Sequence, residues 1–204
     1  MAGERCSWST GSDLYISYHD DEWGRPCYDS VELFELLNLE GAQAGLSWIT
    51  ILQKRENYRK AFKDFDPQKV ARMRDTTIEK LLLDPGIVRN RLKVEGVRTN
   101  AKLYLEMQAN DEDFAEFLWS FVDYVPVQNK RKTMKSVPAT TAQSNAMSKA
   151  LKKRGFKFCG STICYAFMQA AGMVNDHLLT CPSYEPCKNL AASRYMPKGW
   201  PGNA

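Results

Sequence analysis

The sequence STICYAFMQAA, residues 161–171, is apolar on almost every side when it is drawn as a helix. A helix without a polar face is stable only where neighbouring elements cover all of its sides. We therefore predict a buried central helix that ends at Gly172. Cys159 and Cys164 flank the start of this helix, and both are typical of small core residues.

Outward from this segment the pattern is helical nearly throughout, so we expect an all-α fold. A long helix is expected from about residue 90 to residue 107, and Gly155 ends another helix. Candidate N-caps precede the helices: Asp29 or Ser30, Ser47, Asp66 before Pro67, Thr76 in a capping box with Glu79, and Thr141 or Ser144. We expect no strand, a polar loop at 123–141 and a loose C-terminal tail at 182–204.

The composition predicts a soluble, cytoplasmic protein. The chain has 204 residues, 44% of them hydrophobic, which is enough for one large domain or two small lobes. No apolar run is long enough to span a membrane, and the start MAGERCSWSTGSD lacks the apolar core of a signal peptide. The net charge of +4 permits an anionic partner without identifying one.

Two pairs of residues have the spacing of metal ligands. His177 and Cys181 lie four positions apart, and Cys6 precedes His19, the other of the two histidines. Imidazole and thiolate are the ligands that zinc prefers, and four of them close its coordination sphere, so we predict one structural zinc. For an isolated pair, ordinary core residues would be the better interpretation, and Cys187 is a rival ligand to Cys181.

Residues 78–101 read as two helices joined by a short turn that contains glycine. Backbone amides at Gly86, Ile87 and Val88, with the N-terminus of the second helix, are candidates to bind a DNA phosphate. Arg89, Arg91 and Lys93 add positive charge. The alternative is an ordinary helical hairpin, which is common.

The N-terminal part is rich in aromatic residues, and Glu40 interrupts an apolar helix beside them. Aromatic rings with one acidic acceptor suit an extruded purine, which stacks on the rings and donates to the carboxylate. The aromatic candidates are Trp8, Tyr15, Tyr18, Trp23 and Trp48. In the alternative interpretation these rings are core residues and Glu40 is exposed. The segment GAQAGL supplies Gly45 for a close backbone approach and Leu46 as an apolar wedge.

Several long motifs together carry a family resemblance: ERCSW, YHDDEWG, LEGAQAGLSWITIL, GIVRNR and GFKFCGSTICYAFMQAAGMVNDH. In this order they resemble the DNA-3-methyladenine glycosylase I family of the helix–hairpin–helix glycosylase superfamily. The resemblance runs from about residue 4 to Cys181. It implies a single catalytic unit at 1–181, made of two helical lobes, with the helix–hairpin–helix around 76–107.

The resemblance also implies the activity and its residues. The expected reaction is monofunctional hydrolysis of the N-glycosidic bond of 3-methyladenine in double-stranded DNA, with free base and an abasic site as products and a monomer as the active form. Zinc falls on Cys6, His19, His177 and Cys181, which ties the two ends of the unit. Base recognition falls on Glu40 with Trp8, Tyr15, Tyr18 and Trp48. DNA contact falls on Gly45, Leu46 and the hairpin, Gly86, Ile87, Val88, Arg89 and Arg91.

The superfamily's usual catalytic aspartate has no counterpart here, because no Asp lies between Gly86 and Asp111. The named family also lacks it, so the departure fits the resemblance. Two other classes compete with a glycosylase. A non-enzymatic, zinc-stabilised DNA-binding protein would use the same hairpin, and a metallohydrolase would use His19 and His177 at an open zinc position.

Overall fold

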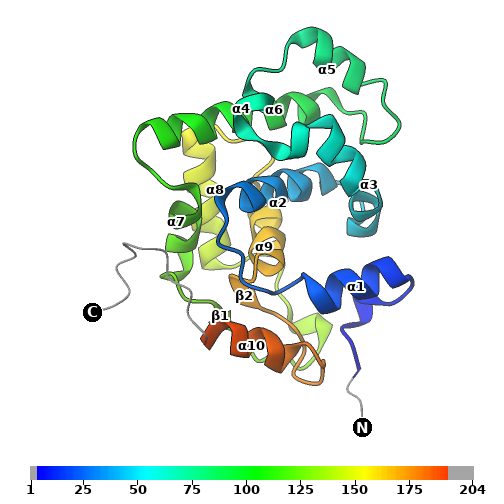
Figure 1. Ribbon diagram of the computed structural model, residues 1–204. Helices are drawn as coiled ribbons and strands as arrows, with labels where there is room; N and C mark the ends of the chain where they lie inside the picture. The colour runs from blue at the N-terminus through cyan, green and yellow to red at the C-terminus, as the bar shows by residue number, and fades with distance from the viewer. Residues whose placement is uncertain (1–3, 193–204) are drawn as a thin grey trace.

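Helix α9, Ser161–Ala170, lies in the middle of the computed structural model, which describes residues 4–192 (Figure 1). Its Cys164, Phe167 and Met168 are fully buried, and the helix packs on α2 and α8, as its apolar sequence predicts. Gly172 follows with φ +67°, and a Cβ there would lie 2.3 Å from the carbonyl carbon of Arg25. Only glycine fits this turn.

The N-terminal elements are a short 3-10 turn η1, Ser7–Ser9, and helices α1, Asp13–Asp21, α2, Ser30–Gln43, and α3, Trp48–Ala61. Helix α2 crosses the core and contacts α3, α6, α7 and α9. The Asp29 side chain accepts hydrogen bonds from the first amides of α2, which confirms it as the cap. Ser47 occupies the N-cap position of α3, but its hydroxyl bonds to the Thr50 hydroxyl instead of a backbone amide.

A group of helices lies above the core in Figure 1: η2, Lys63–Phe65, α4, Pro67–Ala71, α5, Asp75–Leu81, and α6, Arg91–Ala109. Asp66 caps α4 and Asn90 caps α6. The predicted capping box of Thr76 and Glu79 is wrong. Helix α5 already begins at Asp75, so Thr76 lies inside its first turn, and the Arg74 side chain at the N-cap position makes no capping hydrogen bond.

The next elements are α7, Phe114–Trp119, η3, Ser120–Val122, η4, Met134–Ser136, and α8, Ala142–Arg154. Thr141 forms a capping box with Ser144 at the start of α8, and Gly155 ends it in the left-handed conformation. The segment predicted as a loop also holds strand β1, Val127–Gln128, which pairs in parallel with β2, Val174–Asn175. The expectation of no strand is therefore wrong, because two-residue strands are too short to show alternation.

Helix α10, Tyr184–Ala192, occupies much of the segment expected to be a loose tail. Its Cys187 is 2% exposed and packs near the carbonyl oxygen of Trp23. The tail prediction is therefore wrong for 184–192, where apolar residues at helical spacing cover the N-terminal segment. Residues 193–204 lie outside the described part of the chain. Among the described helices, none has the length and apolar character needed to cross a membrane.

Candidate active site and metal centre

The four predicted zinc ligands converge in the fold. Cys6, His19, His177 and Cys181 are all buried, and one donor atom from each lies within 4.8 Å of the others. The Cys181 Sγ is 3.5 Å from His19 Nε2 and 3.6 Å from His177 Nδ1. With bonds of about 2.3 Å to sulfur and about 2.0 Å to nitrogen, a tetrahedral zinc separates such atoms by about 3.5 Å. The donor set and its spacing fit zinc.

The remaining ring nitrogens of both histidines have partners of their own. His19 Nδ1 is 2.8 Å from the Asp20 carboxylate, and His177 Nε2 is 3.1 Å from the carbonyl oxygen of Trp23. Each partner holds a proton on the far nitrogen and so leaves His19 Nε2 and His177 Nδ1 free to bind a metal. Arg5 in turn binds the Asp20 carboxylate at 2.9 Å. Asp20 is thus a positioning residue that the ligand spacing did not reveal.

The cluster also favours the thiolate form of Cys181. Hydrogen bonding from Cys6 lowers the pKa of the Cys181 thiol against the effect of burial. The rival ligand Cys187 lies outside the group of four, and its Sγ contacts the Trp23 carbonyl oxygen at 4.0 Å. The geometry therefore favours Cys181 over Cys187.

The Cys/His cluster lies directly behind an aromatic wall. The ring centroid of Trp8 is 5.3 Å from that of His19, and Trp23 stands 4.6 Å from His177. Trp8 also contacts the ring of Tyr15 at 5.1 Å. The Cys/His cluster therefore contacts the wall directly, through these rings and through the contact of His177 Nε2 with the Trp23 carbonyl oxygen.

In front of this wall is a cavity of about 220 Å³. Every predicted base-binding residue lines it: Trp8, Tyr15, Tyr18, Glu40 and Trp48. Helix α1 supplies the two tyrosines, α2 the carboxylate and α3 the tryptophan at its N-terminus. The centroids of Tyr18 and Trp48 are 5.5 Å apart, so these two rings form one side of the cavity.

Glu40, one of two acidic residues that line this cavity, is 3% exposed. Among the described residues, none is a hydrogen-bond partner of its Oε2 or of the buried indole Nε1 of Trp48. Burial raises the pKa of Glu40 to about 8. A buried acceptor or donor without a hydrogen-bond partner lowers the stability of the folded protein unless a ligand satisfies it. This contradicts the alternative in which Glu40 is merely exposed.

Sequence reasoning missed part of the lining: Gln43, Met134, Val137, Ala166, Gln169 and Asp176, with Trp23 noticed but given no role. One signal was available, because Gln169 is a polar residue on the otherwise apolar face of α9. Met134 and Val137 follow β1, and their approach depends on the unpredicted β1–β2 pairing. Local patterns do not reveal a pairing between segments so far apart in the chain.

The segment after α2 has the shape expected of an inserted loop. Gly45 has φ +79°, a conformation that glycine adopts without strain, and Leu46 is 43% exposed. Lys93 from α6 holds this segment: its Nζ donates to the carbonyl oxygens of Ala42 at 2.9 Å and Ala44 at 2.6 Å. Lys93 therefore faces the end of α2 and does not point outward as a phosphate contact.

The hairpin between α5 and α6 uses many of its amides internally. The Gly86 amide donates to the Asp84 carboxylate at 2.7 Å, and the Val88 amide donates to the Tyr58 hydroxyl at 3.1 Å. Ile87 is buried, with its amide 3.4 Å from the carbonyl oxygen of Asp84.

The two arginines of this segment differ in whether they form an ion pair. Arg91 is bound to both oxygens of Glu79, at 2.7 and 2.8 Å. Arg89 is exposed and has no ion-pair partner in the described part of the chain. In this arrangement Arg89 and the N-terminus of α6 are the groups open to an anion.

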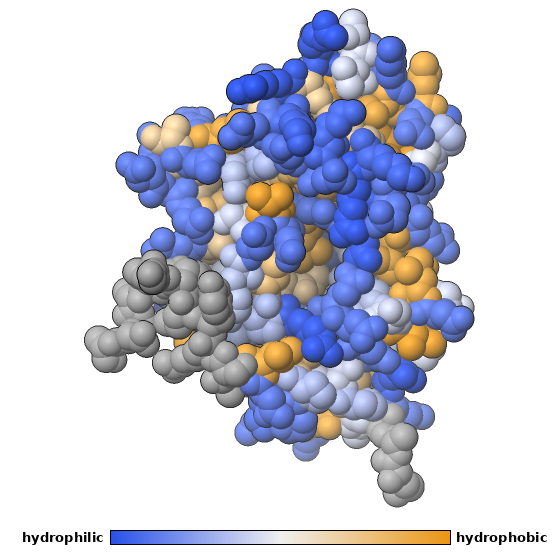
Figure 2. Space-filling model, viewed as in Figure 1, coloured by the Kyte–Doolittle hydropathy of each residue, from blue (hydrophilic) through white to orange (hydrophobic). Residues whose placement is uncertain are grey.

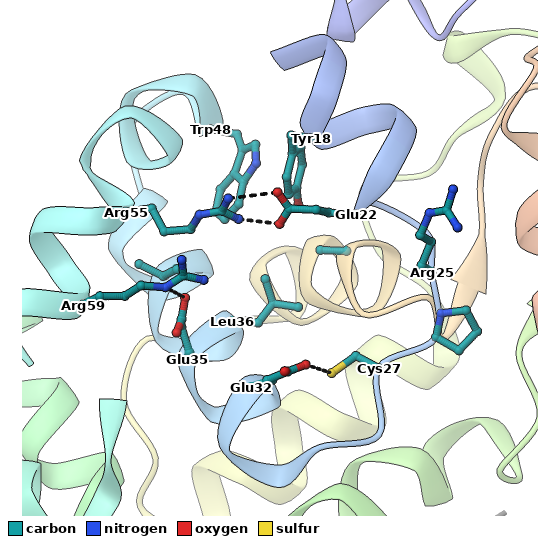
Figure 3. Close-up of a pocket in the computed structure, with 13 residues that line it drawn as sticks. Tyr18, Glu22, Arg25, Cys27, Glu32, Glu35, Leu36, Trp48, Arg55 and Arg59 are labelled. Atoms are coloured by element: carbon teal, nitrogen blue, oxygen red, sulfur yellow. Dashed lines mark hydrogen bonds and ion pairs between the residues drawn. The ribbon is translucent and has the colours of Figure 1, made fainter. Parts of the chain in front are cut away.

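A second cleft, of about 400 Å³, lies on the other side of the Tyr18 and Trp48 rings (Figure 3). Its charges are largely paired: Arg55 from α3 binds both oxygens of Glu22, at 2.5 and 2.9 Å, and Arg59 binds Glu35 at 2.8 Å. The face shown in Figure 2 is mostly hydrophilic, with apolar atoms at the floor of a central hollow. The Glu22–Arg55 pair ties α1 to α3, the two helices that carry these rings.

Taken together, an aromatic cavity with a buried carboxylate is suited to a flat, hydrogen-bonding ligand such as a nucleobase. Comparison with known proteins identifies the family. The model of the methyladenine glycosylase family matches residues 8–184, and the chain belongs to this family.

Relatives of known name agree with this assignment. The chain is 55% identical to DNA-3-methyladenine glycosylase 1 of Escherichia coli (strain K12) over 89% of this chain and 97% of the relative. It is 53% identical to the DNA-3-methyladenine glycosylase of Haemophilus influenzae (strain ATCC 51907 / DSM 11121 / KW20 / Rd) over 87% of this chain and 96% of the relative.

Solved structures give the same result. A crystal structure of 3-methyladenine DNA glycosylase I superposes with a TM-score of 0.88 at 52% identity, covering 89% of this chain and all of the other. The enzyme from Staphylococcus aureus, whose structure addresses 3-methyladenine recognition, superposes with a TM-score of 0.86 at 41% identity, covering 90% and 98% of the two chains.

Proposed function

We propose that this protein is a monofunctional DNA glycosylase of base-excision repair. It hydrolyses the N-glycosidic bond of 3-methyladenine in alkylated double-stranded DNA, releases the base and leaves an abasic site. The observation that carries the proposal is the buried Glu40 Oε2, unpaired within an aromatic cavity. Relatives that are 53% and 55% identical carry the name of this activity, which supports the same substrate here.

The reaction needs no strong proton donor, because 3-methyladenine in DNA is a cation and leaves with the bonding electron pair as a neutral base. Stacking on Tyr18 and Trp48 holds the extruded base. The positive base lowers the pKa of Glu40 from about 8, because an opposite charge favours the carboxylate. The carboxylate then accepts a hydrogen bond from the base and stabilises the oxocarbenium-like sugar, which water attacks at C1′.

Contact with the DNA backbone is assigned to a helix–hairpin–helix made by α5, α6 and the turn between them. The exposed Arg89 side chain, which forms no ion pair with a described residue, and the N-terminus of α6 support binding of a phosphate here. Arg91 contacts the phosphate only when it leaves Glu79. The amides of Gly86, Ile87 and Val88 contact it only when the turn opens. Gly45 and Leu46 are proposed to enter the gap left by the extruded base.

The metal centre is proposed to be a structural zinc on Cys6, His19, His177 and Cys181. When bound, zinc would hold the N-terminal segment to the loop after β2. Four protein ligands leave no position for water, which argues against the metallohydrolase. We further propose a monomer that acts inside the cell as one catalytic unit of two lobes.

The competing function is DNA binding without catalysis. Backbone binding by the hairpin needs neither a buried carboxylate nor an aromatic cavity, and burying Glu40 unpaired lowers stability. The cavity is therefore better explained by a flipped base than by a damage sensor that reads the backbone.

The test is incubation of the purified protein with methylated duplex DNA, followed by chromatography of the released bases. We expect release of 3-methyladenine by the wild-type protein and a loss of about 100-fold in Glu40→Gln. The exposed carboxylate Glu106, changed to Gln, is the matched control and keeps the wild-type rate. Binding of the duplex without release of base would establish the non-enzymatic alternative.

A further inference from the structure

Asp176 is a buried carboxylate to which the reaction described above gives no role. It follows β2, is 1% exposed and lines the same cavity as Glu40. Four side chains donate to it: Asn129 at 2.8 Å, Arg131 at 2.9 Å, Gln169 at 2.8 Å, and the hydroxyl of Tyr165. A carboxylate with four donors, one of them a guanidinium, acts purely as an acceptor.

This carboxylate determines how the amide of Gln169 is oriented. A glutamine amide can present either its oxygen or its nitrogen, and the choice follows from the hydrogen-bond network. Because Asp176 Oδ2 only accepts, Gln169 must direct Nε2 toward it. Its Oε1 then accepts no hydrogen bond from any residue in the described part of the chain.

The position on α9 places this oxygen at the cavity. Gln169 lines the cavity together with Ala166, one turn earlier on the same face, whose small side chain leaves room for a ligand. Tyr165, four residues before Gln169, donates to the same carboxylate and holds the end of the network. The acceptors at the cavity therefore include two from different helices, Glu40 on α2 and Gln169 on α9.

We propose that Gln169 is a specificity-determining residue that reads the exocyclic amine of the base, with Asp176 as its positioning residue. An amine brings two N–H donors, which suit two acceptors. A 6-oxo purine presents an oxygen at the same place, and that oxygen faces the Gln169 oxygen without a proton between them. The inference rests on the proposed binding of a methylated purine, although it does not require that the bond be cleaved.

The test compares two free bases, 3-methyladenine and 3-methylhypoxanthine, by NMR titration of the wild-type protein and of Gln169→Met. Methionine keeps the length of the side chain and removes the acceptor. We expect the wild-type protein to prefer the amine, and the variant to lose about fivefold to tenfold in affinity for 3-methyladenine with little change for the 6-oxo base. The spectrum of the free variant shows whether it is folded.

Gln143→Met is the matched control, because Gln143 is exposed on α8 and lies outside the cavity. It should keep the wild-type preference. An unchanged preference in Gln169→Met, or an equal loss in Gln143→Met, would overturn the proposal.

A measurement on the wild-type protein needs no variant. The side-chain amide protons of Gln169 should exchange with solvent more slowly than those of the exposed Gln143, and equal rates would also refute the inference. A protein that discriminates the two bases but releases none from DNA would fail as a glycosylase and still support this role of Gln169.

Discussion

The carboxylate of Glu40 lies in the last turn of α2, buried and with Oε2 unpaired. Burial raises its pKa from 4.5 to about 8. Between these values the folded protein retains a proton that the unfolded chain has released. The free energy of unfolding therefore falls as the pH rises through this window, by about 1.4 kcal/mol per pH unit where the difference is complete.

This pH dependence gives a prediction at the scale of one residue. In Glu40→Gln the amide does not titrate, so its free energy of unfolding should fall less between pH 5 and pH 8 than that of the wild-type protein. Urea unfolding at several pH values measures the difference between the two curves. Glu106→Gln, at an exposed position, should run parallel to the wild type. Parallel curves for Glu40→Gln would show that the carboxylate is hydrated in the folded state.

At the scale of elements, Lys93 connects α6 to the end of α2 at the candidate DNA-binding face. Lys93 stands in the first turn of α6 and donates to two carbonyl oxygens at the C-terminus of α2. A cation there also complements the negative end of the helix dipole. Burial lowers the pKa of Lys93, so the contact is made at the expense of some hydration.

Lys93→Met should loosen the segment that carries Leu46. The variant leaves the carbonyl oxygens of Ala42 and Ala44 without their charged donor, which typically costs about 1.5–3 kcal/mol. We expect faster hydrogen exchange of the amides at 44–47, and a larger loss in excision from duplex DNA than in affinity for free 3-methyladenine. Lys102→Met, an exposed position on the same helix, is the control and should change neither. Equal losses in the two assays would place Lys93 in base binding instead.

Elements with strong local signals could be predicted from the sequence. The apolar face of α9 and the caps at Asp29 and Asp66 depend only on neighbours in the chain, and the structure confirms them. Thr76 and Glu79 have the residue types of a capping box, but the helix begins two residues earlier, with Arg74 at the N-cap position. Helix α10 was missed because its apolar residues acquire a partner only when the N-terminal segment folds back on it.

The candidate site shows the same division. The Cys/His spacing and the acidic interruption at Glu40 are local, and the fold brings these residues together. The contribution of Asp176 was not visible in the sequence. Two of its donors, Asn129 and Arg131, lie far earlier in the chain, and the other two are on the preceding helix α9. A buried network of this kind arises from tertiary contacts alone.

At the scale of the whole molecule, the Cys/His cluster joins chain segments that are far apart. Cys6 and His177 are 171 positions apart, and their side chains are 3.9 Å from each other. The cluster also supports the aromatic wall through Trp8 and Trp23. A metal bound only by the folded state stabilises that state by mass action, so the protein's stability should depend on zinc.

Elemental analysis of the purified protein should therefore find one zinc per chain. Removing it with a chelator should lower the midpoint of thermal unfolding, and added zinc should restore it.

Cys6→Ser should lower both zinc content and stability, because a site left with three good ligands binds zinc more weakly. The folded fraction of this variant should still bind 3-methyladenine. Cys27→Ser is the control: Cys27 is half-buried and lies outside the cluster, so this variant should keep the response to zinc. Metal-free protein with full stability would show that the cluster is only a packed group of thiols and imidazoles. A folded Cys6→Ser protein that has lost binding of free base would instead show that the metal centre shapes the cavity in front of it.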